Sequence, residues 1–392
     1  MNSTTDDIRG ELDGLRRAGT YKRTSTLDGP MGPTVRLADG RTVVNLCSNN
    51  YLGLADHPEV VAASTRAMKS YGYGTASVRF ICGSFTVHEE LERAIAEFLG
   101  LEKATTYVSC WNANEALVPT LLSGDDAVIS DELNHASIID ACRLCAKQVR
   151  KLIYHHSDMS DLARALAEAV HARRKLVITD GVFSMEGDLA RLPEIVELAG
   201  KHGALVAVDD SHAHGVVGKT GRGTPEHFGV AVDIVTGTLG KALGGAAGGF
   251  IAGPAPIIEL MVQRSRPQLF SNALPPGTAG GALGALRVLV RESERVARLQ
   301  ENVAYLRGGL KSLGYEVIDS PTAIVPVIVG GTAKALRLAG AMLDHGVLIT
   351  GFGYPVVPEG KARLRAQVSA VHTREHLDLA LGAFKALRAE VL

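Results

Sequence analysis

A regular alternation of short apolar runs and helical patterns between residues 104 and 251 constrains the fold of this chain more than any other feature. The strand-like runs are rich in β-branched residues and cover 104–108, 127–130, 152–154, 175–179, 204–208, 233–237 and 249–251. The helical stretches between them cover 112–123, 136–147, 160–173 and 193–202. Strands that alternate with helices form a mostly parallel sheet covered on both faces. The pattern therefore predicts an α/β fold.

The segments on either side of this alternation predict a second, smaller domain. With 392 residues, the chain suits one large and one smaller domain. The further expected helices cover 5–18, 58–71, 87–99, 277–313 and 374–388, and the further expected strands cover 42–47, 315–318, 323–329 and 347–350. We therefore predict an N-terminal helix and extended arm at 1–40, a large α/β domain at 41–285, and a small α+β domain with an antiparallel sheet at 286–392.

The charge balance and the cysteine content limit the expected partners and location. A formal net charge of −1 gives no basic surface for nucleic acid or an anionic membrane. No apolar run reaches the length of a membrane span, and Met1 to Asp7 lack the basic and apolar regions of a signal peptide. Five cysteines are few and odd in number, which is typical of a reducing compartment. We expect no nucleic-acid partner, no membrane association and a cytoplasmic location.

Polar side chains follow the predicted strands at the points where these strands end. They lie in the segments 109–110, 131–135, 180–184, 209–212 and 238–241. Ligands of open α/β sheets bind at the carboxyl ends of the strands. The sequence therefore predicts one site to which all five segments contribute.

Lys241 lies in a run of small residues, Thr-Gly-Thr-Leu-Gly-Lys-Ala-Leu-Gly-Gly, directly after a predicted strand. Apolar surroundings lower the pKa of an ammonium group, and a Schiff base requires a neutral amine. We therefore hypothesise that Lys241 binds pyridoxal phosphate covalently. A glycine-rich turn with an incidental lysine is the alternative. A phosphate loop is disfavoured because Ala242 offers no hydroxyl for magnesium.

Asp209 and His212 follow the apolar strand that ends at Val208. A carboxylate facing the pyridine nitrogen keeps that nitrogen protonated, and we assign this role to Asp209. His212 is then close enough along the chain to reach the phenolic oxygen of the cofactor. Two alternatives stay open: a metal cluster that adds Asp210 and His214, and a His212 that is only a core residue.

Further strand-end residues suit the remaining parts of such a cofactor. His135 offers a planar ring for stacking, although its segment is equally typical of a plain helix start. The helix that begins near Cys110 and Trp111 offers backbone N–H groups to a phosphate. Ser184 supplies a hydroxyl in a tight turn. Arg365 is a candidate for binding a substrate carboxylate, although a surface strand is the simpler interpretation.

Several longer stretches resemble the α-oxoamine synthases, a family of pyridoxal-phosphate enzymes of fold type I, over about residues 40 to 375. The matching stretches are Ser-Asn-Asn-Tyr-Leu-Gly-Leu (48–54), Ala-Ser-Val-Arg-Phe-Ile-Cys-Gly (76–83), Leu-Asn-His-Ala-Ser-Ile-Ile-Asp (133–140), Thr-Asp-Gly-Val-Phe-Ser-Met (179–185), Val-Asp-Asp-Ser-His-Ala (208–213), Gly-Thr-Leu-Gly-Lys-Ala-Leu-Gly-Gly (237–245) and Arg-Ser-Arg-Pro-Gln-Leu-Phe-Ser-Asn (264–272).

The resemblance implies roles for individual residues of this chain. Lys241 would bind the cofactor and later move the α-proton, and Asp209 would pair with the pyridine nitrogen. His135 would stack on the ring and position substrate. The other implied contacts are Ser184 and His212 on the phenolic side, Cys110, Trp111 and Thr238 at the phosphate, Asn49 and Arg365 at the substrate, and Ser271 and Asn272 from a second subunit. The site would then exist only in a homodimer.

The resemblance also implies the reaction, in which an amino acid condenses with an acyl-CoA. The members that the chain resembles most join glycine to acetyl-CoA. Members that use alanine and pimeloyl-CoA, or another acyl-CoA, are the alternative within the family, and an aminotransferase on the same fold is a further alternative. Trp111 and Gly353 differ from the residues usual in the family, so we expect them to bear on substrate choice.

Overall fold

The computed structural model describes residues 3–22 and 24–391. Residues 1, 2 and 23, which belong to the predicted arm at 1–40, and residue 392 lie outside the described residues. No helix within the described ranges combines the length and the apolar character that a membrane crossing requires.

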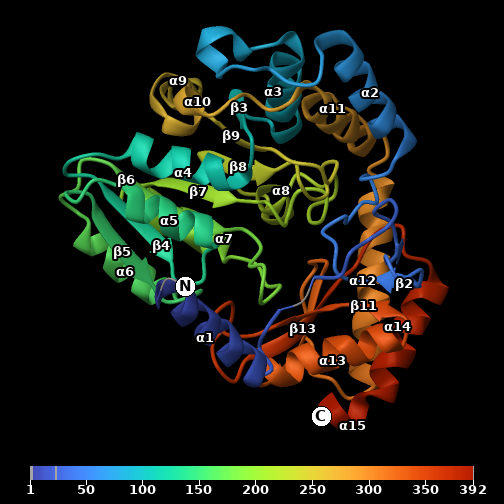
Figure 1. Cartoon of the computed structure of the whole chain (residues 1–392). Coiled ribbons are helices and arrows are strands. Elements are labelled where there is room, and N and C mark those ends of the chain that lie inside the picture. Colours follow the sequence, from blue (N-terminus) through green and yellow to red (C-terminus); the bar gives the residue numbers. More distant parts are fainter. Residues whose placement is uncertain (1–2, 23, 392) are drawn as a thin grey trace.

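A seven-stranded sheet forms the centre of the larger part of the molecule (Figure 1). Its spatial order is β3-β9-β8-β7-β6-β4-β5, and only β9 runs antiparallel to its neighbours. The strands are β3 (Lys103–Tyr107), β4 (Ala127–Asp131), β5 (Arg150–Tyr154), β6 (Lys175–Asp180), β7 (Leu205–Asp209), β8 (Ile234–Thr238) and β9 (Gly249–Gly253). The predicted alternation of strands and helices is confirmed.

Helices cover both faces of this sheet because the strand side chains are apolar on both sides. One face packs against α4 (Cys110–Leu121), α5 (Ala136–Leu144) and α9 (Ala255–Arg264). The other face packs against α6 (Met159–Glu168) and α7 (Leu192–Lys201). Ile178 belongs to the first core and Val177 to the second, as expected for neighbouring residues of one strand.

The C-terminal part contains an antiparallel sheet of order β10-β13-β12, which confirms the predicted small α+β unit. Its strands are β10 (Ile324–Gly330), β12 (Thr350–Phe352) and β13 (Ala362–Gln367), and its helices are α12 (Glu294–Ser312), α13 (Thr332–Asp344), α14 (Arg374–Ala386) and α15 (Arg388–Val391). A third sheet pairs β2 (Thr42–Asn45) with β1 (Thr34–Arg36) and, in parallel, with β11 (Val347–Leu348). The domain boundaries stay a prediction, and β2 ties the N-terminal arm to the C-terminal part.

The remaining helices lie around the large sheet in Figure 1. They are α1 (Ser3–Arg17), α2 (Pro58–Tyr71), α3 (Thr86–Leu99), α8 (Thr224–Phe228), α10 (Arg266–Phe270) and α11 (Pro276–Arg291), with a short π-helical turn at Arg79–Gly83. Helices α2, α3, α11 and α12 share one large apolar core with the C-terminal sheet.

Two expectations about secondary structure are wrong. The single helix predicted over 277–313 is two helices, because Glu292 adopts the non-helical angles φ −119° and ψ 52° and ends α11. The carboxylate of Glu292 pairs with both Arg291 and Arg295 across this break. The segment 315–318, predicted as a strand, is irregular chain. Tyr315 is buried because its ring and hydroxyl contact Phe384 of α14, and it does not pair with another strand.

His156 contacts both the turn at 181–189 and the end of β4. Its Nδ1 lies 3.1 Å from Asp131 Oδ1, and its Nε2 lies 3.0 Å from Asp188 Oδ2. Its ring also contacts the Phe183 ring edge-on at 4.3 Å between centroids. Burial alone would lower the pKa of His156, but the two carboxylates outweigh burial and raise this pKa to about 10. The turn that carries Ser184 is therefore held by a charged imidazole at neutral pH.

We expect the free energy of unfolding to fall between pH 6.5 and pH 10 through His156. Below its ordinary pKa of 6.5, His156 is protonated in the folded and the unfolded chain, and its full stabilisation is present. Above that pH only the folded chain keeps the proton, and the stabilisation is lost as the pH rises through about 10. His156→Gln should remove roughly 1–4 kcal/mol of this pH-dependent decline in urea titrations. Parallel pH profiles for the two proteins would contradict the assignment.

Candidate active site

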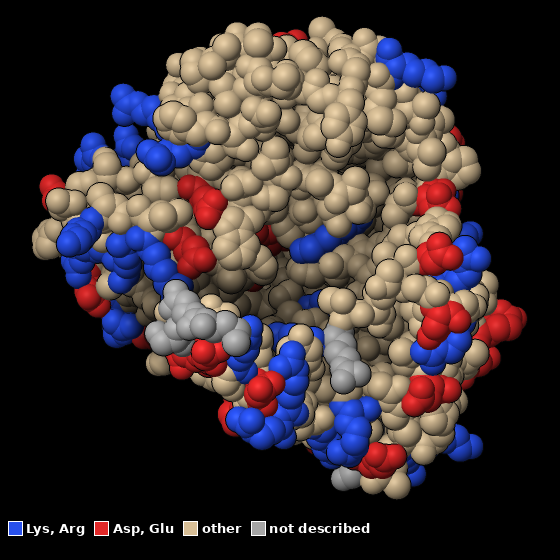
Figure 2. Space-filling model, in the orientation of Figure 1, with Lys and Arg blue, Asp and Glu red and all other residues tan. Residues whose placement is uncertain are grey.

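A cavity of about 220 Å³ lies at the carboxyl ends of the parallel strands. Its lining combines all five predicted segments: Ser109, Cys110, Trp111, His135, Ser137, Asp180, Val182, Ser184, Asp209, Ser211, His212, Thr238 and Lys241. Figure 2 shows this side of the molecule hollowed between its two parts, with basic side chains visible inside the hollow. The structure therefore brings together eight of the predicted site residues in one place.

Lys241 lies in the turn that follows β8 and lines this cavity. Burial lowers its pKa below the ordinary value of 10.5, while the carboxylate of Asp209 acts in the opposite direction. The net shift is downward. A larger share of Lys241 is therefore in the neutral, nucleophilic form than for an exposed lysine.

Asp209 ends β7 and is only 4% exposed. Its Oδ1 accepts the N–H of Ser211 at 2.9 Å, and its Oδ2 accepts Asn114 Nδ2 at 2.6 Å. Burial alone would raise the pKa of Asp209, but these hydrogen bonds and the charge of Lys241 lower it below 3.8. Among the described residues no basic side chain forms an ion pair with Asp209. A buried, ionised carboxylate with neutral partners fits a protonated ring nitrogen.

Asn114 connects Asp209 to Ser137, another residue that lines the cavity. Besides Asp209, its amide nitrogen donates to Ser137 Oγ at 2.9 Å, and its oxygen accepts Thr236 Oγ1 at 3.0 Å. Ser137 Oγ lies 2.7 Å from His135 Nδ1. Asn114 is fully buried, so this chain of contacts fixes both Asp209 and His135.

His135 immediately precedes α5 and caps it. Its Nδ1 accepts the backbone N–H of Ser137, so the ring proton lies on Nε2. Burial and the charge of Lys241 lower the pKa of His135, against the opposing effect of Asp209. The Trp111 ring meets the His135 ring edge-on at 5.8 Å between centroids. The imidazole is therefore neutral and held in one orientation on the cavity wall.

His212 lines the same cavity as Lys241 and contacts Tyr51. Its Nδ1 is 2.8 Å from the Tyr51 hydroxyl. Burial, Lys241 and Arg365 together lower the pKa of His212 well below 6.5, and burial raises the pKa of Tyr51. At neutral pH both groups are uncharged hydrogen-bonding partners.

The start of α4 and Lys241 line the same cavity, and the backbone N–H groups of a helix start suit an anion. Ser109 caps this helix by accepting the N–H of Asn112 at 3.1 Å, and the following residues Cys110 and Trp111 line the cavity. Glycine is required at Gly249 on β9, since a Cβ there would lie 2.3 Å from the nitrogen of Cys110. Thr238 Oγ1 closes the other side, 3.1 Å from the nitrogen of Gly240. The lysine, the carboxylate and this anion site together fit pyridoxal phosphate.

Arg365 and Asn49 lie next to the cavity without lining it. Arg365 Nη1 donates to the carbonyl oxygen of Ser184 at 2.7 Å. The side chain of Asn49 lies 3.2 Å from the hydroxyl of Tyr51, which itself contacts His212. Arg365 therefore lies one contact away from the cavity lining, and Asn49 lies two contacts away.

Ser271 and Asn272 do not reach this cavity within the chain. They follow α10 and line a separate, small cavity beside Arg79. Asn272 also pairs with Val78 through a short backbone bridge. Their predicted role in a second subunit stays a prediction.

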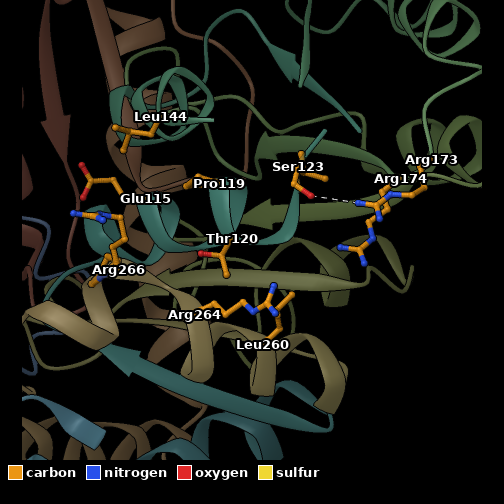
Figure 3. A pocket seen from close by; sticks show the side chains of 12 residues that line it. Glu115, Pro119, Thr120, Ser123, Leu144, Arg173, Arg174, Leu260, Arg264 and Arg266 are labelled. Atoms are coloured by element: carbon orange, nitrogen blue, oxygen red, sulfur yellow. Dashed lines mark hydrogen bonds between the residues drawn. The ribbon is translucent and has the colours of Figure 1, made fainter. Parts of the chain in front are cut away.

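A larger cavity of about 600 Å³ lies along α4 and contains none of the predicted site residues (Figure 3). Arg173, Arg174, Arg264 and Arg266 line it. Glu115 on its rim accepts Trp111 Nε1 at 2.7 Å. Trp111, which lines the candidate site, is therefore bonded to a residue of this larger cavity.

The alternative metal cluster is not formed by the four side chains considered for it. Asp210 accepts two hydrogen bonds from Thr224, at 2.7 Å each. His212 contacts Tyr51, and neither ring nitrogen of His214 has a described partner. These side chains point to different neighbours, so they do not converge on one point.

Gly353 contacts α13 rather than the candidate site. A Cβ at this position would lie 2.3 Å from Thr332 Oγ1. Packing against Thr332 is therefore sufficient to explain the glycine.

Sequence reasoning missed several residues that organise the site, above all Asn114, Tyr51 and Gln367. Asn114 interrupts the apolar pattern of α4, and this interruption was the available signal. Tyr51 and Gln367 are joined across 316 residues of sequence, which no local pattern reveals.

Comparisons with known proteins agree over nearly the whole chain. A family model for aminotransferase class I and II matches residues 41–384. An 8-amino-7-oxononanoate synthase of Symbiobacterium thermophilum is 48% identical over 99% of this chain and 98% of its own. The human mitochondrial 2-amino-3-ketobutyrate coenzyme A ligase is 48% identical over 96% of this chain and 90% of its own. A solved structure of serine palmitoyltransferase with pyridoxal phosphate matches with a TM-score of 0.93 and 33% identity. The match covers 99% of this chain and 98% of that protein's chain.

Proposed function

The chain belongs to the aminotransferase class I and II family and, within it, to the pyridoxal-phosphate-dependent α-oxoamine synthases, and from this premise we propose that it condenses glycine with acetyl-CoA. The products would be 2-amino-3-oxobutyrate and free CoA. The 2-amino-3-ketobutyrate coenzyme A ligases among its relatives support this choice. The chain is an enzyme, and pyridoxal phosphate is its cofactor.

Pyridoxal phosphate supplies an electron-accepting ring that stabilises negative charge on the α-carbon of an amino acid. Lys241 would hold it covalently, and its amine would take and return the α-proton. Asp209 would keep a proton on the ring nitrogen, and the neutral His212 would donate to the phenolic oxygen. His135 would cover the ring, and the start of α4 with Thr238 would bind the phosphate.

The observation that carries amino-acid binding is the buried charge of Arg365. Its side chain is 8% exposed, and among the described residues it has no acidic partner, whereas Arg363 on the same strand pairs with Glu186 at 3.0 Å. A guanidinium stays charged when buried, and a buried charge without a counter-ion is costly. A substrate carboxylate would provide the missing partner beside the Lys241 cavity.

Arg365→Ala is expected to raise the KM for glycine at least about tenfold and leave the KM for acetyl-CoA within about twofold. The reason is that only glycine brings a carboxylate to this position. Steady-state kinetics with each substrate varied in turn measures the effect. Arg298→Ala, which removes an exposed arginine on α12, is the matched control. An unchanged KM for glycine would refute the role.

The amino-acid half of the proposal is tested without any acyl donor. In deuterated water, the enzyme should exchange an α-hydrogen of glycine faster than an α-hydrogen of alanine or serine, as followed by proton NMR. Faster exchange with alanine would instead support the second candidate, an 8-amino-7-oxononanoate synthase that uses alanine and pimeloyl-CoA. The Symbiobacterium relative supports this second candidate.

A homodimer that shares its active sites is the proposed assembly. Phe270 of α10 is 73% exposed, and Phe80 and Ile81 in the adjoining turn are also exposed. Figure 2 shows few charged side chains on the surface over α3 and α10. An apolar surface of this kind is typical of a subunit interface. It would bring Ser271 and Asn272 of one copy to the cavity of the other.

The cytoplasmic location stays a prediction, since some relatives are mitochondrial.

If the sites are shared, mixing two inactive variants should restore activity. Lys241→Ala and Asn272→Ala subunits, refolded together, would form heterodimers in which one site has both residues intact. We expect activity up to about a quarter of the wild-type level in the mixture and almost none in either parent. A mixture as inactive as its parents, in dimers shown to have exchanged, would contradict shared sites.

A further inference from the structure

The guanidinium of Arg365 is fixed on three sides before any substrate arrives. Its Nη1 donates to the carbonyl oxygen of Ser184 at 2.7 Å. Its Nε and Nη2 lie 3.2 and 3.1 Å from the side-chain amide of Gln367. The ring of Phe352 lies 4.4 Å from its Cζ. An arginine has five N–H donors, and these contacts use three of them. Nη1 also lies 4.0 Å from Met185 Sδ, which is a weak acceptor. A carboxylate that replaces this sulfur contact would bind both terminal nitrogens with two parallel hydrogen bonds.

Only one orientation of the Gln367 amide gives both Arg365 and Tyr51 a complementary partner. Its oxygen faces Arg365 and accepts from both Nε and Nη2, and its nitrogen donates to the Tyr51 hydroxyl at 3.1 Å. Gln367 follows Arg365 by two residues on β13, so both side chains lie on the same face of the strand. Gln367 is 1% exposed, and its amide therefore cannot exchange these partners for water.

Tyr51 extends the same network to the cofactor cavity. Its hydroxyl accepts from Gln367, so its single proton faces two acceptors, His212 Nδ1 at 2.8 Å and Asn49 Oδ1 at 3.2 Å. The shorter contact is the one to His212. With Nδ1 as the acceptor, the proton of a neutral His212 lies on Nε2. One chain of hydrogen bonds thus joins Arg365 to His212 through Gln367 and Tyr51.

We propose that Gln367 is a positioning residue that orients the Arg365 guanidinium for the amino-acid carboxylate and connects it through Tyr51 to His212. The inference rests on the proposed binding of an amino acid at Arg365. Gln367 itself touches neither substrate nor cofactor. Its removal would leave Arg365 charged, buried and held only by Ser184 and Phe352, so carboxylate binding would lose part of its prepared geometry.

The test compares two ligands that differ only in the carboxylate. Glycine and glycinamide are titrated into the cofactor-loaded enzyme, and binding is read from the absorbance of the cofactor without any acyl donor. Gln367→Met keeps the side-chain length and removes the amide. We expect the dissociation constant of glycine to rise about tenfold and that of glycinamide to stay within about twofold. Gln300→Met, at a half-buried glutamine that bonds Val216, is the matched control and should change neither.

A loss of equal size for both ligands would mean a general structural role and would overturn the proposal, as would unchanged glycine binding. Gln367→Glu serves if the methionine variant does not fold. Its carboxylate keeps the acceptor for Arg365 but neutralises the charge, so it should also weaken glycine and spare glycinamide. Thiol release with acyl-CoA is measured separately on the wild-type enzyme. A failure there would refute the condensation but leave the ligand comparison intact.

Discussion

Replacing Lys241 with alanine is expected to abolish turnover and to remove the absorbance band of the covalently held cofactor. The structure offers one lysine among the residues that line the cavity, and burial lowers its pKa. Both the covalent bond to the cofactor and the movement of the α-proton depend on this amine. The loss in kcat should be at least about 10³-fold. Absorbance spectra and thiol release on the purified variant measure the two effects.

Lys219→Ala is the matched control for this prediction. Lys219 also follows a glycine, at Gly218, but it is exposed and does not line the cavity. Its variant should keep the absorbance band and remain within about twofold of wild-type activity. Retention of the band and of turnover in Lys241→Ala would refute the assignment of Lys241.

Asp209→Asn is the second substitution with a large expected effect. It keeps the size of the side chain and removes the negative charge that would hold a proton on the ring nitrogen. Losing one partner of a buried charge pair costs about 3–5 kcal/mol. We therefore expect kcat to fall at least about a hundredfold and the cofactor to dissociate more readily. Turnover and cofactor titration by absorbance measure both quantities.

Asp233→Asn is the control for the charge removal, because Asp233 accepts the N–H of Val206 at 2.8 Å and does not line the cavity. Asn114→Leu should have an intermediate effect, since it removes one hydrogen bond to Asp209 but leaves the carboxylate in place. Wild-type kcat in Asp209→Asn would contradict the pairing of Asp209 with the ring.

The position of the site was predictable because β-strand alternation fixes where the polar residues gather. Asp209 and Lys241 are far apart in sequence, yet each follows a buried strand of the same sheet, and parallel neighbours end at one edge. The helix that begins at Cys110 was predictable for the same reason. These inferences needed only local patterns and one rule of topology.

The residues that orient the site were not predictable in the same way. Gln367 and Tyr51 have no local pattern that marks them, because their roles arise from contacts between β13 and the segment after β2. The break at Glu292 was hidden because the apolar periodicity continues through it. In each case a tertiary contact decides the outcome, and a single sequence does not record that contact.

The most direct test of the proposed activity is thiol release by the pyridoxal-phosphate-loaded enzyme. Glycine, alanine and serine are each offered with acetyl-, pimeloyl- and palmitoyl-CoA, and free CoA is followed with a thiol reagent. The account predicts that the specificity constant kcat/KM is highest for glycine with acetyl-CoA and that CoA is released only when an amino acid is present. A higher value for alanine with pimeloyl-CoA, or amino-group transfer to a keto acid without CoA release, would contradict it.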